Sequence, residues 1–99
     1  QQEQRVYTLV SATLQHIRTD IKAIYIARPH PEHETLEEVF AYGQGGTPAA
    51  EILEQSQHVL QTRQTYRDEC TLCIPLLYGE KTLGVLRLRV GAPLHAEED

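Results

Sequence analysis

The feature of this sequence that most constrains its fold is a pair of apolar segments near the C-terminus, separated by a short polar turn. The segments Thr71–Tyr78 and Leu83–Val90 are rich in aliphatic residues, and the turn between them reads Gly-Glu-Lys. Two such segments on either side of a glycine-containing loop predict a β-hairpin. The last third of the chain is therefore expected to form two antiparallel strands.

The register of this hairpin divides its side chains between two faces. A three-residue loop sets Ile74 opposite Leu86 and makes one face apolar. The same register sets Leu72 opposite Leu88. The other face is then expected to carry Thr71, Cys73, Pro75, Val85, Arg87 and Arg89, with Tyr25 alongside from an earlier strand.

The remaining segments predict an α+β fold. Apolar residues at steps of three and four predict a helix over Glu3–Thr19, with Val6, Leu9, Val10, Leu14 and Ile17 on its apolar face. A second helix is predicted over Pro48–Thr62 after a Thr-Pro start signal, with Ile52, Leu53, Ser56, Val59 and Leu60 on one stripe. Further strands are predicted at Ile21–Arg28, Thr35–Tyr42 and Gln64–Glu69. The order indicates an antiparallel sheet of about five strands, with the first helix on one face and the second as a crossover.

Length and charge limit the classes of function. A chain of 99 residues is expected to form a single domain spanning residues 1–99. The net charge of −5 argues against a nucleic-acid partner, because phosphate contacts need a clustered excess of Lys and Arg. No apolar run approaches the ~20 residues of a membrane span, and the N-terminus does not read as a signal peptide. We therefore expect a cytoplasmic domain without membrane insertion.

The segment Cys73–Leu88 resembles the terminal hairpin of GAF domains, in which an apolar pair, Pro-Leu, a glycine-containing turn and a Gly-Val-Leu strand recur. The helix Ile52–Thr62 is similar to the helix that leads into that sheet. The resemblance implies a GAF-like fold of PAS-like architecture and a sensory or regulatory role in a signalling protein such as a sensor histidine kinase. The segment His95–Asp99 resembles the start of the family's last helix, so we expect a longer protein with a covalently linked output domain.

The GAF resemblance also implies a ligand site on the sheet face away from the first helix. Tyr25, Cys73, Arg87 and Arg89 are the candidate ligand-binding residues on that face. Paired arginines suit an anionic small molecule, because guanidinium groups present a forked set of donors. The alternative is a solvated sheet face with its charges balanced by glutamates. Because the first helix is expected to cover the face that carries Leu88, Leu88→Asp is expected not to be tolerated, whereas Arg87→Ala is expected to be mild. No cofactor is assigned.

The cysteines argue against an enzyme. Cys70 and Cys73 are three positions apart, so in an extended strand their thiols point to opposite faces and cannot share a zinc ion or a disulfide. Cys73 opposite Arg87 could instead hold a reactive thiolate and act as a redox switch. Some GAF-fold proteins reduce free methionine sulfoxide with pocket cysteines, so a reductase of this kind is an alternative function for the chain. No catalytic triad or phosphate-binding glycine loop is found.

Two further features bear on possible metal binding and on assembly. The segment His30–Glu34 holds two histidines and two carboxylates, which suits a transition metal but reads better as a solvated turn. Tyr7, Ala12 and Leu14 widen the apolar stripe of the first helix, so a homodimer is expected. A purely structural dimerisation module is a third reading of the chain.

Overall fold

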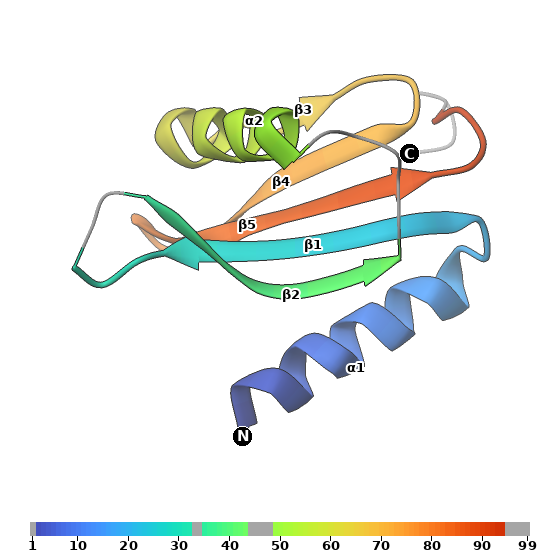
Figure 1. The fold of residues 1–99 in the computed structure, drawn as a ribbon, viewed down its shortest axis with the longest axis horizontal. Coiled ribbons are helices and arrows are strands. Elements are labelled where there is room, and N and C mark those ends of the chain that lie inside the picture. The colour runs from blue at the N-terminus through green and yellow to red at the C-terminus, as the bar shows by residue number, and fades with distance from the viewer. Residues whose placement is uncertain (1, 33–34, 44–48, 95–99) are drawn as a thin grey trace.

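The computed structural model describes residues 2–32, 35–43 and 49–94. Within these ranges the elements are α1 (Gln2–Ile17), β1 (Ile21–Pro29), β2 (Leu36–Gly43), α2 (Ala49–Thr62), β3 (Tyr66–Arg67), β4 (Thr71–Tyr78) and β5 (Lys81–Val90). The strands form one antiparallel sheet in the order β2-β1-β5-β4-β3. Figure 1 shows α1 on one face of this sheet and α2 on the other. The predicted α+β class is confirmed.

The β4–β5 hairpin has the predicted register but a shorter turn. Both predicted pairs are present, Ile74 with Leu86 and Leu72 with Leu88. The turn consists of Gly79 and Glu80 alone, because the strands pair up to Tyr78 and Lys81. A bulge opposite Leu76 and Leu77 takes up the residue that the shorter turn leaves over. The two apolar segments therefore pair in the predicted register, although the turn that joins them is shorter than predicted.

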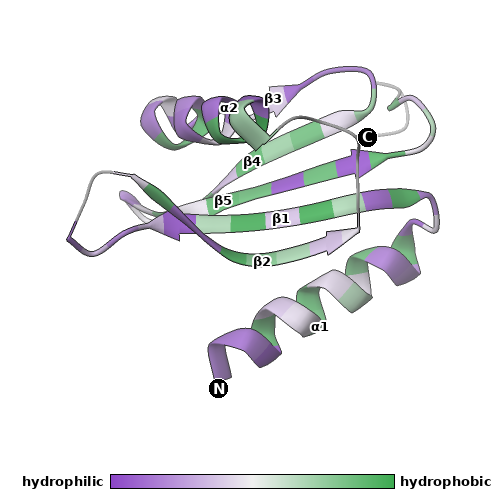
Figure 2. Cartoon of the chain, viewed as in Figure 1, coloured by the Kyte–Doolittle hydropathy of each residue, from purple (hydrophilic) through white to green (hydrophobic). Residues whose placement is uncertain are grey.

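The face covered by α1 is apolar. Its buried core consists of Ile21, Ile24, Ile26, Leu86 and Val90, against which α1 packs Tyr7, Val10 and Leu14. Figure 2 shows hydrophobic residues running along the central strands. The predicted apolar face of this helix is only partly right, because Val6, Leu9 and Ile17 are 54%, 67% and 74% exposed. The sheet contacts a narrower stripe than the apolar residues of α1 occupy.

An ion pair joins the start of α1 to the sheet. There, Glu3 pairs with Arg28 at the end of β1, and Arg28 also pairs with Glu37 of β2. In the loop that follows α1, Arg18 pairs with Asp20 at 2.6 Å. The Glu3–Arg28 pair therefore links α1 to the sheet in addition to its apolar packing.

The opposite face is covered by α2, which packs on β4 and β5. Val59 is fully buried there and forms a small cluster with Cys73 and Val85. The expected solvated face is therefore wrong for this half of the sheet, because the apolar stripe of α2 turns towards it.

Several features singled out in the sequence lie outside the described residues. They are the Thr47-Pro48 start signal, Gly45, Gly46, His33, Glu34 and the segment 95–99.

Candidate functional site

A row of paired side chains crosses the sheet on the α2 side. Arg87 of β5 pairs with Tyr25 of β1 and with Cys73 of β4. Cys73 in turn pairs with Tyr66 of β3. Directly paired residues of antiparallel strands point to the same face, and Arg89 lies on this face two positions along β5. The structure therefore brings the four predicted site residues together on one face.

Arg87 is the buried cation of this row, with 2% of its surface exposed. Its Nε donates to Oε1 of Gln55, on α2, at 2.9 Å. Burial lowers the pKa of Arg87, and the positive charge of Arg89 acts in the same direction. A guanidinium nevertheless stays protonated in proteins, so a positive charge is held between the helix and the sheet.

Arg89 places a second positive charge beside the first. Its Nη1 donates to the hydroxyl of Thr71 at 2.9 Å, and Thr71 is fully buried. Cys73, Asp68 and Glu51 raise the pKa of Arg87 and so oppose the effect of Arg89. The α2 face thus holds two neighbouring guanidinium groups that repel each other.

Cys73 lies between these arginines and α2 as a neutral thiol. It is fully buried, and burial raises its pKa to about 11, although Ser56 and Arg87 act in the opposite direction. The suggested reactive thiolate is therefore wrong, because desolvation outweighs the nearby charge. Cys70 packs against the cluster on the α1 side instead. Both cysteines are free, and they belong to different faces as predicted.

Sequence reasoning missed two residues that α2 contributes. Gln55 accepts the hydrogen bond from Arg87, and Ser56 is fully buried in the face of α2 that contacts the sheet. The sequence signal for Ser56 is a serine in the middle of an otherwise apolar stripe. That signal indicates a site residue only once α2 is known to lie over Cys73.

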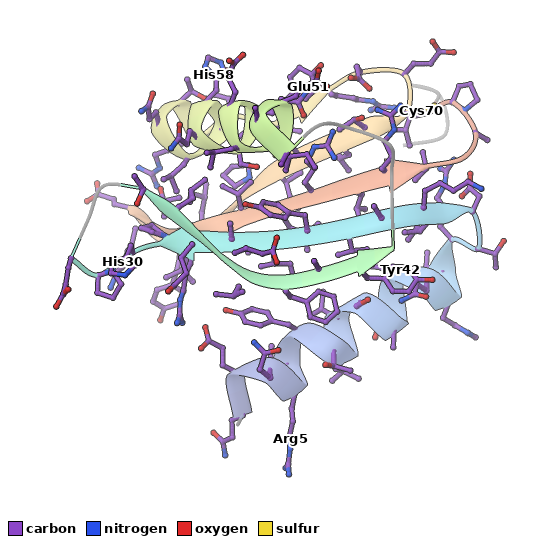
Figure 3. All side chains as sticks on the ribbon, in the orientation of Figure 1. Arg5, His30, Tyr42, Glu51, His58 and Cys70 are labelled. Carbon is purple, nitrogen blue, oxygen red and sulfur yellow. The ribbon has the colours of Figure 1, made fainter. Side chains whose placement is uncertain are left out.

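Two surface clefts differ in their relation to this row. One of about 220 Å³ is lined by Glu54, Gln55, His58 and Tyr66, so it reaches the row through Gln55 and Tyr66. Figure 3 shows His58 at the outer side of α2. The other cleft, of about 450 Å³, lies at the end of the sheet and is lined by Arg28, Pro29, His30, Pro31, Lys81, Thr82 and Leu83. It contains none of the predicted site residues.

The described residues hold no group of three or more His, Cys, Asp or Glu side chains that could bind a metal ion. In the predicted turn, His30 Nδ1 accepts a hydrogen bond from the backbone N–H of Glu32 at 3.1 Å. Among the described helices, neither has the length and apolar character that crossing a membrane requires.

Comparison with known proteins bears on the fold. No family model matches the chain, and no curated protein matches it. Among solved structures, it is similar to the photoproduct state of GAF3 from Slr1393 of Synechocystis sp. PCC6803, with a TM-score of 0.59 and 17% identity. The match covers 96% of this chain and 82% of that one. This similarity shows that the chain has the fold of a GAF domain, as its terminal hairpin predicted.

Proposed function

We propose that this chain is a cytoplasmic sensory or regulatory domain of a signalling protein, without catalytic activity, and that it binds a small anionic molecule between α2 and the sheet. The observation that carries the proposal is the juxtaposition of Arg87 and Arg89 on the face covered by α2. An anion beside them would offset the repulsion between two guanidinium groups held at low solvent exposure.

The hydrogen bonds at the end of β5 support a route from this site to α1. Arg89 is followed two residues later by Gly91, whose N–H donates to the carbonyl of Asp20 at 2.8 Å. The Ala92 N–H donates to Oδ2 of Asp20 at 2.9 Å, and Arg18 donates to the Ala92 carbonyl at 3.1 Å. Ligand binding that shifts β5 would therefore bias the packing of α1. We propose a sensor kinase as the whole protein, with an output domain linked to this one.

The test is a thermal-shift and NMR titration of the purified chain with small anions and small neutral molecules. Binding should raise the melting temperature and move amide signals of α2, β4 and β5. The variant Arg89→Gln should lose the response to anions while remaining folded, because Arg89 is partly exposed. A chain that binds none of these molecules would contradict the proposed sensory role.

A structural dimerisation module is the second candidate, because α1 exposes large apolar side chains. Val6, Leu9 and Ile17 project outside the contact with the sheet. Tyr7 and Leu14, expected in a dimer contact, pack on the sheet instead, whereas Ala12 is exposed. We propose a homodimer through the exposed stripe, formed by two copies about a two-fold axis. Sedimentation equilibrium should show dimers at micromolar concentration and monomers for Leu9→Glu. A wild type that stays monomeric contradicts this assembly.

The reductase alternative is less well supported. A thiol with a pKa of about 11 is protonated at neutral pH and is a poor nucleophile. Methionine sulfoxide reduction that is lost in Cys73→Ser would contradict the assignment as a non-enzyme.

A further inference from the structure

The Ser56 hydroxyl is a polar group for which the described part of the chain offers no hydrogen-bond partner. Its Oγ is buried, and the residue has 0% of its surface exposed. A buried hydroxyl without a partner destabilises a fold, because it loses its bonds to water and gains nothing in return. Such a group in the middle of a buried helix face calls for a partner that the described residues do not supply.

The surroundings of Ser56 do not satisfy this hydroxyl. Ser56 and the Cys73 thiol act on each other as hydrogen-bonding neighbours, but sulfur is a weak acceptor and the contact lacks the geometry of a hydrogen bond that would satisfy the hydroxyl. On the same face, Val59 and Val85 belong to the apolar cluster around Cys73 and offer no polar side-chain atoms. This cluster therefore offers the hydroxyl no nitrogen or oxygen partner, and its neighbour Cys73 is paired across the strands with Arg87.

Ser56 is close to that row through two connections. Its neighbour in sequence, Gln55, accepts the hydrogen bond from Arg87, and Cys73 is the cross-strand partner of Arg87. The cleft of about 220 Å³ reaches the same place, since Gln55 and Tyr66 line it. A small molecule in that cleft would lie beside Gln55, which accepts the hydrogen bond from Arg87 and is the sequence neighbour of Ser56.

We propose that the Ser56 hydroxyl is a ligand contact, and that the molecule bound on this face carries an oxyanion, either phosphate or carboxylate. One oxygen lies against the Arg87 guanidinium and another accepts a hydrogen bond from Ser56 Oγ. The inference rests on the proposed function, because it specifies the group recognised at the same site. The neutral state of Cys73 is compatible with it, since a thiol does not repel an anion as a thiolate would.

The chain contains a matched control for Ser56. Ser11 is the corresponding buried serine of α1, at 2% exposure, but its Oγ accepts a hydrogen bond from Gln15 at 3.0 Å. The same substitution at both positions therefore removes one hydroxyl that lacks a partner and one that has a partner inside the fold. Ser56→Ala should weaken binding without lowering stability, whereas Ser11→Ala should lower stability without weakening binding.

The experiment is a calorimetric and NMR titration of the full chain with inorganic phosphate and with acetate, at constant ionic strength set by chloride. One of the two anions should bind the wild type, and which one binds distinguishes a phosphate ligand from a carboxylate ligand. Ser56→Ala should weaken that binding about tenfold, which is the loss of one hydrogen bond to a charged group, without lowering the melting temperature. Ser11→Ala should lower the melting temperature and leave the affinity unchanged.

Three results would overturn the inference. These are an unchanged affinity in Ser56→Ala, an equal loss of affinity in both variants, and no binding of either anion to the wild type. If neither anion binds but a neutral molecule moves the amide signals of α2 and β5, this inference fails and the sensory function stands. If an anion binds through Ser56 without any change in the α1 signals, the contact stands and the proposed relay to α1 fails.

Discussion

The two faces of the sheet differ in the kind of side chain that they bury. The face under α1 buries Ile24, Ile26 and Leu86 in a continuous apolar core. The face under α2 buries Arg87, Thr71 and Ser56, which are polar. A small domain gains its stability from apolar burial, whereas buried polar groups contribute little or destabilise it. The difference indicates that the larger apolar core lies on the α1 face, while the α2 face combines a smaller apolar cluster around Cys73 with buried polar side chains.

The largest expected effect comes from adjacent residues of β1 that point to opposite faces. Ile24→Ser should destabilise the domain by about 3–5 kcal/mol, because it leaves a cavity in the core and buries a hydroxyl. Tyr25→Ser should cost less, since Tyr25 is only partly buried. Urea denaturation of the two variants measures this difference. Equal losses would mean that the two faces contribute equally to stability.

The second effect concerns the nature of the Arg87 side chain. Arg87→Ala should cost about 1–3 kcal/mol, because it removes packing and leaves Gln55 without its described donor. This replaces the mild effect expected for a solvated face. Arg87→Met should cost less than Arg87→Ala, since a buried charge replaced by an apolar chain of similar length recovers its desolvation penalty. If chemical denaturation shows equal losses for Arg87→Met and Arg87→Ala, the guanidinium itself stabilises the fold and the apolar packing of the side chain does not.

A smaller effect is expected at the contact of α1. Leu14 packs on the core but is only partly buried, so Leu14→Ala should cost about 1–2 kcal/mol, less than the 2–5 kcal/mol of a fully buried leucine. Ile17→Ala is the control, because Ile17 is 74% exposed and its truncation should hardly change the midpoint of unfolding. A larger loss at Ile17 would indicate that its side chain is covered in solution.

A further effect separates the two thiols. At pH 8, Cys70 should react with a disulfide reagent within the mixing period and Cys73 only as fast as the domain opens, because Cys73 is fully buried. Burial raises the pKa of Cys73 from 9.0 to about 11, so its contribution to stability is complete below pH 9 and is lost as the pH rises towards 11. Cys73→Ala should flatten that loss, which thermal unfolding between pH 8 and 11 measures. An unchanged slope would contradict the assigned pKa.

Much of the fold could be predicted because local patterns determine it. The hairpin register followed from the apolar pairs Ile74–Leu86 and Leu72–Leu88, and the bulge changed the turn without changing which residues face each other. The same register placed Cys73 and Arg87 on one face. The covering of that face by α2 could not be predicted, because helix periodicity shows which side of a helix is buried and does not show against which sheet face. Ser56 and Gln55 therefore became site residues only in three dimensions.

The most direct test of the proposed binding site is a two-dimensional NMR map of the wild-type chain with and without saturating small oxyanion, phosphate or acetate. The amide signals of residues 55–59, 71–73 and 87–89 should move most, and those of the core strand residues facing α1 should move least. Shifts centred on the cleft formed by Pro29, His30 and Lys81, or no shifts at all, would contradict the claim that the α2 face is the binding site.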